Sequence, residues 1–220
     1  MAKRVGVLLS GCGVQDGSEI HEAVLCLLAL DRHGAQAVCT APDLHQHEVV
    51  NHLTGEATTG ERRNALVESA RIARGKIRRI DTIKATDLDA ILVPGGFGAT
   101  KNLCNYHMAH DKARPRPEVA RLLKEMHVAK KPIGALCLGP VVLAAVFRDG
   151  AHLKLTIGHD AKTAEALGQM GAVHEVCAAG DICVDEANKI VSSPAYMLAA
   201  GPAELWTGID KLVERLLQMI

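Results

Sequence analysis

The residue with the most reactive side chain in an unusual setting is Cys137, which stands between two apolar segments. The run Ile133 to Leu136 follows a Lys-Pro turn signal and predicts a short buried strand. Gly139 and Pro140 then begin a second apolar segment, and proline is favoured in the first turn of a helix. The sequence therefore places Cys137 on a sharp strand-to-helix turn, as in a nucleophile elbow.

An elbow of this kind would make the thiol chemically useful. Small residues, Ala135 and Gly139, stand two positions before and after Cys137, where an elbow is crowded. The helix that follows would direct its N-terminus at the sulfur and favour the thiolate, so we expect a lowered pKa and a nucleophilic cysteine. The alternative is a cysteine that only packs in the core, because free cysteine is among the most buried residue types.

The elements that would position this turn alternate between strand and helix. Buried strands are predicted at Val5 to Leu9, Ala35 to Ala41, Ala90 to Val93, Ile133 to Leu136 and Leu153 to Ile157. Short loops and intervening helices imply a mostly parallel sheet with helices on its faces. An antiparallel hairpin is predicted near the C-terminal end, at Ile182 to Val184 and Lys189 to Val191.

The first helix is predicted to run to about Arg32, and its start is ambiguous. Asp16 and Glu19 have a spacing like that of a capping box, and Ser18 is a rival N-cap. Glu22 lies about one turn into this helix, near the edge of the sheet where the first strand ends.

Turns that follow parallel strands lie at one edge of the sheet, where ligands bind in open α/β folds. Four such turns contain unusual residues: Ser10 to Gly13, Pro94 to Gly98, the Cys137 elbow and Gly158 to Asp160. A thiol, a carboxylate, the imidazole of His159 and backbone donors from glycine-rich turns would therefore converge. The sequence predicts a catalytic site at this edge.

The composition excludes several classes of protein. Lys plus Arg and Asp plus Glu both number 25, and aromatic residues make up 2%, so we expect no nucleic-acid partner. No apolar run is long enough for a membrane span, and we expect no membrane partner. The seven cysteines form no CxxC pair and no secretory signal precedes them, which predicts reduced thiols and a cytoplasmic location.

Three histidines close together, His45, His47 and His52, could be drawn as a metal site. No predicted helix or hairpin fixes their side chains, and no metal-binding motif surrounds them. We therefore predict solvated histidines and no metal site.

Several strings, among them SGCGVQDGSEIHE, VPGGFGATKNL, KPIGALCLGP and PAYMLA, resemble the ThiJ/PfpI superfamily and, within it, the ElbB-type branch of "enhancing lycopene biosynthesis" proteins. The resemblance covers nearly the whole chain. It implies one domain over residues 1–220 with a flavodoxin-like, class I glutamine amidotransferase-like fold, a three-layer α/β sandwich. It also implies a reactive elbow cysteine matching Cys137, an acidic partner matching Glu22, and glyoxalase activity without a cofactor.

The chain departs from the superfamily pattern at two positions. Many members carry histidine directly after the cysteine, where this chain has Leu138. A histidine would have to come from elsewhere, and His159 is the best placed. A glutaminase triad in this fold has an acid two residues beyond the histidine, and that position is Ala161. This departure argues against amidotransferase chemistry.

We therefore predict a cofactor-free glyoxalase that converts small 2-oxoaldehydes, such as methylglyoxal and glyoxal, to 2-hydroxy acids. Cys137 is the predicted nucleophile and Glu22 the general acid and base, with His159 as a possible aid. Glu19 is the competing acid, and it is better suited to capping the helix. The alternatives are a redox-responsive or binding protein that uses the same thiolate, and a deglycase or amidase.

Backbone and side-chain groups near the elbow complete the predicted site. The N–H groups of Gly96 and Leu138 could form an oxyanion hole. Gly95, Cys12 and Asn102 are expected to line the substrate pocket. The only partners expected are a small aldehyde and a second copy of the chain in a homodimer.

Overall fold

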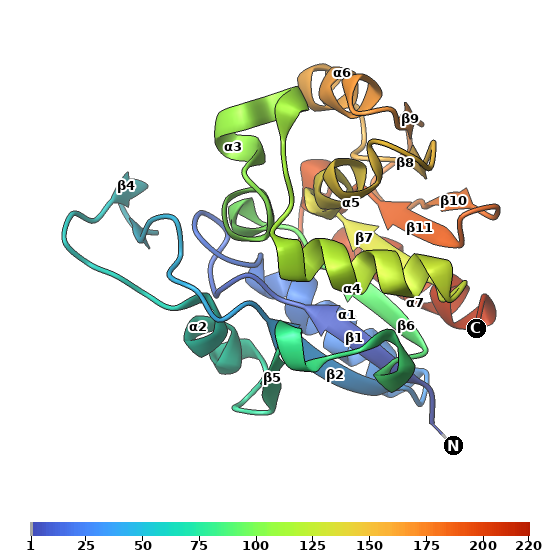
Figure 1. Ribbon diagram of the computed structural model, residues 1–220, viewed down its shortest axis with the longest axis horizontal. Coiled ribbons are helices and arrows are strands. Elements are labelled where there is room, and N and C mark those ends of the chain that lie inside the picture. The colour runs from blue at the N-terminus through green and yellow to red at the C-terminus, as the bar shows by residue number, and fades with distance from the viewer. Residues whose placement is uncertain (1) are drawn as a thin grey trace.

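The computed structural model describes residues 2–220, and its apolar runs form a central sheet of seven strands. These are β1 (Arg4–Leu8), β2 (Gln36–Ala41), β5 (Ile77–Arg79), β6 (Ala90–Val93), β7 (Ile133–Leu136), β10 (Cys183–Asp185) and β11 (Ile190–Ser193). Their order across the sheet is β10-β11-β7-β6-β1-β2-β5 (Figure 1). All neighbours are parallel except β10, which pairs with β11 as the predicted antiparallel hairpin.

The three central strands, β1, β6 and β7, set the position of the site. Val5 pairs with Ala90, and Leu92 pairs with Gly134, so the three strands end at about the same level. Every residue of β6 and β7 is buried, as expected for strands covered on both faces. The predicted bounds of these two strands are confirmed.

Helices cover both faces of the sheet and make three layers. Helices α1 (Ile20–Arg32) and α7 (Pro202–Gln218) pack together behind the sheet in Figure 1, while α4 (Pro117–Val128) and α5 (Gly139–Phe147) lie in front of it. One apolar cluster fills each space between sheet and helices. The predicted α/β fold of the class I glutamine amidotransferase type is confirmed.

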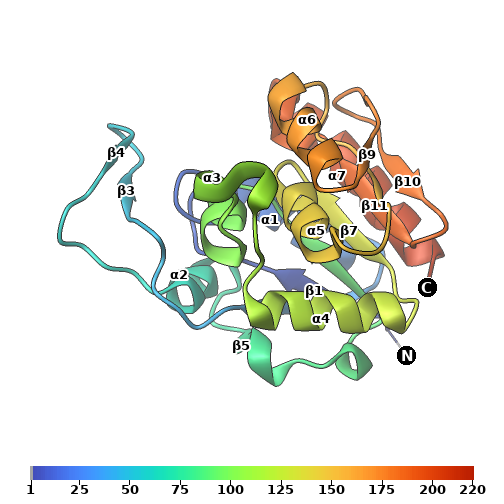
Figure 2. The same cartoon turned by 45° about the horizontal axis from the view of Figure 1, so that its top comes forward.

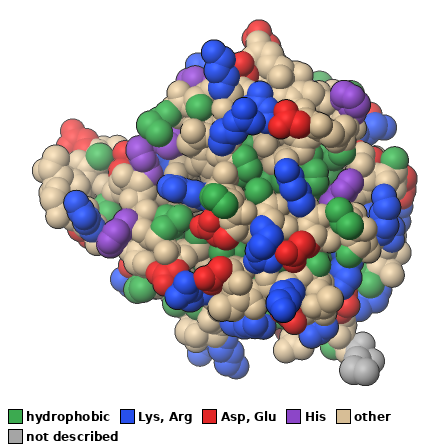
Figure 3. Space-filling model, viewed as in Figure 1, with side chains coloured by type: hydrophobic (Ala, Val, Ile, Leu, Met, Phe, Trp, Pro, Cys, Tyr) green, Lys and Arg blue, Asp and Glu red, His purple; other side chains and the backbone are tan. Residues whose placement is uncertain are grey.

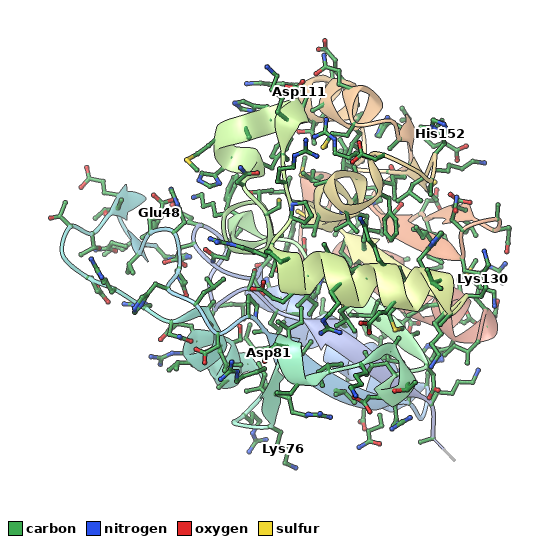
Figure 4. The ribbon with its side chains drawn as sticks, viewed as in Figure 1. Glu48, Lys76, Asp81, Asp111, Lys130 and His152 are labelled. Carbon is green, nitrogen blue, oxygen red and sulfur yellow. The ribbon has the colours of Figure 1, made fainter. Side chains whose placement is uncertain are left out.

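Smaller elements complete the chain. The remaining helices are α2 (Ala65–Ile72), α3 (Tyr106–Ala109) and α6 (Ala161–Gln169), and a π-helical turn spans Ala99–Leu103. Short 3₁₀ turns occur at Ile80–Thr82, Ala85–Asp87, His110–Lys112 and Ala195–Met197. The strands β3 (Val50–Asn51) and β4 (Glu56–Ala57) form a hairpin that projects from the body (Figures 1 and 2), and Figure 4 labels Glu48 at its base.

One predicted strand belongs elsewhere. The run predicted from Leu153 to Ile157 forms only β8 (Lys154–Leu155), which pairs with β9 (Val173–His174) in a separate two-stranded sheet. An apolar run shows that a strand is buried but does not show which sheet it joins. The turn after β8 therefore does not follow a strand of the central sheet.

Side-chain caps set the start of two helices. Helix α2 begins at Ala65, because the Asn64 side chain caps it. The segment 105–117 contains α3 and a 3₁₀ turn. Helix α1 is capped by Glu19, so neither Asp16 nor Ser18 is the N-cap.

The surface agrees with the balanced composition. Positive and negative side chains are interspersed on the face shown in Figure 3. Within residues 2–220, no helix has both the length and the apolar character needed to cross a bilayer.

Candidate active site

Cys137 occupies a strained turn between β7 and α5. Its φ angle is 53°, in the left-handed region that residues other than glycine rarely adopt. Its N–H donates to the carbonyl of Ser193 on β11 (3.0 Å), which holds the turn against the neighbouring strand. Backbone strain of this kind clusters at functional sites. The predicted elbow is present.

Two glycines allow the backbone to come close to this turn. A Cβ at Gly139 would lie 2.3 Å from the carbonyl oxygen of Val93, so the first residue of α5 cannot carry a side chain. A Cβ at Gly95 would lie 2.6 Å from the Cβ of Cys137 and 2.7 Å from a carboxylate oxygen of Glu22. Gly95 thus acts by letting the cysteine and the glutamate approach each other.

Glu22 reaches this point because of the way α1 begins. The Glu19 side chain caps the helix by accepting the N–H of Glu22 (2.7 Å), and the Glu19 N–H donates to the carbonyl of Gly95 (3.0 Å). The start of α1 is therefore held against the turn that follows β6. The expectation that Glu19 serves as the cap is confirmed.

The Glu22 carboxylate is fully buried and has three partners. It accepts the N–H groups of Gly95 (2.8 Å) and Tyr196 (3.3 Å), and it shares a hydrogen bond with the Cys137 thiol. Burial, followed by the nearby charge of Glu19, raises the pKa of Glu22 to about 7, although these hydrogen bonds lower it. The carboxyl group can therefore change its protonation state near neutral pH.

The expected lowering of the Cys137 pKa is wrong. Burial and then the charge of Glu22 raise the pKa of this thiol well above its ordinary value. The backbone N–H groups of Gly96 and Leu138 point at the sulfur and lower the pKa, but they do not outweigh burial. Only 7% of the residue's surface is exposed, so the helix N-terminus acts on a thiol that has lost its water.

The resulting pair of acids contains both a nucleophile and its base. Because the thiol donates to a buried carboxyl group whose pKa is about 7, ionised Glu22 can take the thiol proton as sulfur attacks. The N–H groups of Gly96 and Leu138 lie where an oxygen on the attacked carbon could accept them. The site can therefore add a thiol to a carbonyl and move protons between adjacent atoms.

His159 is not among the groups that most strongly influence the pKa values of Glu22 and Cys137. It is exposed on the turn between β8 and α6, and none of the described residues forms a hydrogen bond with its side chain. The next residue, Asp160, is the N-cap of α6 and accepts the N–H of Thr163 (2.8 Å). β8 is not a strand of the central sheet, although it packs against β10 and β11, so the turn that carries His159 does not follow a strand of that sheet.

Two other predicted residues have different surroundings. Cys12 is half-buried, and burial raises the pKa of its thiol. Nearby carboxylates raise this pKa further and nearby guanidinium groups lower it; these charged side chains are Glu68, Asp16, Arg71 and Arg63. Asn102 is fully buried, and both ends of its amide are used within the protein. The amide donates to the carbonyls of Ser10 and Asp16 (both 2.8 Å) and accepts the N–H of His47 (2.9 Å), so it joins three loops.

Sequence reasoning missed the segment that completes the Glu22 site. Ala195, which is buried, has a φ angle of 49°, and this strained turn aims the N–H of Tyr196 at Glu22. The Tyr196 phenol in turn bonds to Nδ1 of His21 on α1 (2.7 Å). The contribution of Tyr196 to Glu22 is a backbone group, and no residue type signals such a contact.

The sequence is similar to known proteins over nearly its whole length. Residues 14–193 match the DJ-1/PfpI family. The chain is 43% identical to the human protein named "Glutamine amidotransferase-like class 1 domain-containing protein 3, mitochondrial", over 99% of this chain and 84% of that protein. It is 29% identical to the zebrafish "ES1 protein, mitochondrial", over 98% of this chain and 85% of that protein.

Solved structures agree with the fold described above. A crystal structure of an "isoprenoid biosynthesis protein with amidotransferase-like domain" from Ehrlichia chaffeensis superposes with a TM-score of 0.92 at 40% identity, covering 99% of this chain and 100% of that one. Drosophila melanogaster DJ-1beta superposes with a TM-score of 0.53 at 18% identity, covering 100% of this chain and 96% of that one, which is a likeness of fold alone.

Proposed function

Because this chain belongs to the DJ-1/PfpI family and pairs a buried thiol with a titrating carboxyl group, we propose that it is a glyoxalase of that family. In this proposal Cys137 and Glu22 convert small 2-oxoaldehydes, such as methylglyoxal and glyoxal, to 2-hydroxy acids, with water as the only co-reactant. The observation that carries the proposal is the Glu22 carboxyl group, which is fully buried, bonded to the Cys137 thiol and has a pKa of about 7.

The first step is addition of the thiol to the aldehyde. The sulfur of Cys137 forms a bond to the aldehyde carbon, and ionised Glu22 takes the thiol proton and passes it to the new alkoxide. The N–H groups of Gly96 and Leu138 stabilise that oxygen while it carries charge. The product is a neutral hemithioacetal, and Glu22 is again ionised. A thiolate is never free in this scheme, which suits a thiol whose pKa is raised.

The second step moves a proton between the two carbons. Ionised Glu22 takes the proton from the sulfur-bearing carbon, giving an enediolate, and the protonated carboxyl group returns that proton to the neighbouring carbon. The hydroxyl proton on the sulfur-bearing carbon moves to the oxygen of the neighbouring carbon, so that a carbonyl forms beside the sulfur and Glu22 is again ionised. The result is a thioester of the 2-hydroxy acid. Water cleaves the thioester, which releases the acid and restores the thiol. A base with a pKa near the working pH is best suited to both taking and giving the proton.

His159 has no step in this scheme, since the proton transfers need only Glu22. Leu138 stands where many superfamily members carry a histidine, and Ala161 stands two residues beyond His159, where a glutaminase triad would have its acid, so the chain lacks both features. The sensor alternative needs a thiolate at rest, and the raised pKa of Cys137 argues against one. Membership of the ElbB-type branch, a cytoplasmic location and a homodimer stay predictions.

The direct test is to incubate the purified protein with methylglyoxal, without added thiol or cofactor, and to detect lactate by proton NMR. A parallel incubation with glutamine measures release of ammonia. We expect lactate and no ammonia. Ammonia release without lactate would replace the proposal with amidase chemistry, and neither product would leave the sensor or binding protein as the better account.

A further inference from the structure

A pocket of about 360 Å³ lies beside the elbow, and the proposed reaction at Cys137 leaves it unused. Its walls come from the turn after β6, the π-helical turn, α3, the elbow and the start of α6, and they include Phe97, Thr100, Tyr106, His107, Leu138 and Thr163. The volume falls in the range of small-molecule sites. A three-carbon aldehyde would fill little of it.

Two residues of the pocket wall are next in sequence to the groups that surround the sulfur. Leu138 follows Cys137 directly and Phe97 follows Gly96 directly, and the N–H groups of Leu138 and Gly96 are the two that point at the sulfur. A substrate whose carbonyl oxygen accepts those N–H groups would therefore have its far end beside Phe97 and Leu138.

Aromatic side chains are concentrated here in a chain that has few of them. The whole sequence contains two phenylalanines, two tyrosines and one tryptophan, yet both Phe97 and Tyr106 line this pocket from separate elements. Phe97 is 46% exposed, and the Lys101 ammonium lies over its ring, 5.1 Å from the ring centre. Exposed aromatic rings beside a pocket are suited to stacking on flat apolar groups.

The basic side chains of the pocket, Lys101 and His107, are already paired, which argues against an anionic ligand. The Lys101 ammonium donates to the carbonyl of Gln15 (2.8 Å) and is paired with Glu48. His107 bonds through one nitrogen to the carbonyl of Thr100 and through the other to His47 (both 3.1 Å). No described residue of the wall presents an unpaired cation, so a phosphate or carboxylate tail would gain little here.

We infer that this pocket binds the substituent of the substrate, and that the preferred substrates are 2-oxoaldehydes with a flat or bulky apolar substituent. This inference rests on the proposed function. Phenylglyoxal is the simplest such compound. It would react as methylglyoxal does, with its aldehyde carbon on the sulfur and its ring between Phe97 and Tyr106, and the product would be mandelate.

The first test compares kcat/KM for phenylglyoxal and methylglyoxal. We expect the parent protein to favour phenylglyoxal by roughly 10-fold or more, the usual worth of filling an apolar pocket. The variant Thr163→Phe narrows the pocket and should reduce that ratio by a similar factor. Thr59→Phe is the matched control, because Thr59 is exposed on the projecting hairpin segment and should leave both substrates unchanged.

The second test does not depend on turnover or on the Thr163 variant. Calorimetry on Cys137→Ala should detect binding of mandelate. The affinity for lactate should be lower than that for mandelate by a factor of about 10 or more. If methylglyoxal is converted but the parent ratio is one or less, or if mandelate binds no better than lactate, the inference is wrong while the glyoxalase proposal stands. If neither aldehyde is converted but mandelate binds more tightly than lactate, the glyoxalase proposal is wrong, while the preference of the pocket for an apolar substituent stands.

Discussion

Two strand–turn–helix units of this molecule share a sequence pattern but differ in chemistry. In the first, β7 leads through Cys137 into α5, and in the second, β8 leads through His159 into α6. Both have an apolar run, a turn with a reactive side chain and a helix. β7 lies inside the seven-stranded sheet between β6 and β11, whereas β8 pairs only with β9 in the part of the chain that the structure describes.

That difference in pairing decides what each turn can do. Cys137 is buried beside Glu22, and every residue of α5 is buried. His159 is exposed, and only Ala166 and Leu167 of α6 are buried. A reactive side chain after a strand becomes part of a site only when that strand ends at the same edge as the others. The predictions that follow test this contrast, beginning with the largest expected effect.

The largest effect is expected from Cys137→Ala. Removing the sulfur removes the covalent step, so lactate formation from methylglyoxal should fall to the rate without protein. The control is Cys12→Ala, which removes a half-buried thiol from a different turn and should retain turnover. If Cys12→Ala is inactive and Cys137→Ala is active, the nucleophile is not Cys137 on the turn between β7 and α5.

The next effect concerns stability and follows from burying Glu22. Its pKa is about 7 in the folded protein against 4.5 ordinarily, so the folded state holds the proton more tightly. Stability from this group is therefore complete below pH 4.5 and is lost as the pH rises to about 7, by on the order of 3 kcal/mol.

Urea unfolding of the parent and of Glu22→Gln, at pH 4 and pH 8, measures that loss. The glutamine variant does not titrate at this position, so its stability relative to the parent should increase between the two pH values. A difference between the two proteins that is the same at pH 4 and pH 8 would mean that Glu22 has an ordinary pKa.

A smaller effect is expected from Glu19→Gln. Glutamine can still accept the Glu22 N–H, so the weaker cap should lower the free energy of unfolding by about 1 kcal/mol or less. The lost charge is one of the causes that raise the pKa of Glu22. The rising limb of kcat/KM against pH should therefore move to lower pH, while turnover at pH 8 stays near that of the parent. A large loss of turnover at pH 8 would make Glu19 the acid of the reaction.

The smallest effect is expected from His159→Ala, which sharpens the contrast between the two turns. Because His159 is exposed and is not among the groups that most strongly influence Cys137 or Glu22, kcat/KM for methylglyoxal should stay within about twofold of the parent value. A loss of 10-fold or more would show that this turn moves to the site when substrate binds.

The contrast also explains how far the sequence predicts the structure. The apolar runs Ala90 to Val93 and Ile133 to Leu136 predict β6 and β7 correctly, because strands buried on both faces have that composition. The run Leu153 to Ile157 has the same composition but a different sheet, since strand pairing depends on distant residues.

The chemistry of the site shows the same division. The elbow and the position of Glu22 follow from local pattern and family resemblance. The pKa of Cys137 does not, because it depends on burial and on a carboxylate that is distant in sequence, and the local effect of the helix N-terminus is the weaker one. The role of Asn102 does not follow from local pattern either, since its partners lie on two segments that are distant from it in sequence.

The central claim is that Glu22 acts as the base for Cys137, and the variant Glu22→Gln tests it most directly. Glutamine keeps the shape of the side chain but cannot take or give the proton, so conversion of methylglyoxal to lactate should fall by roughly 10²–10⁴-fold. Alkylation of Cys137 at pH 9, followed on the same sample by mass spectrometry of the peptide that contains it, should reach the same extent as in the parent. Turnover at the parent rate would contradict the account, because the proposed proton transfers would then have no base.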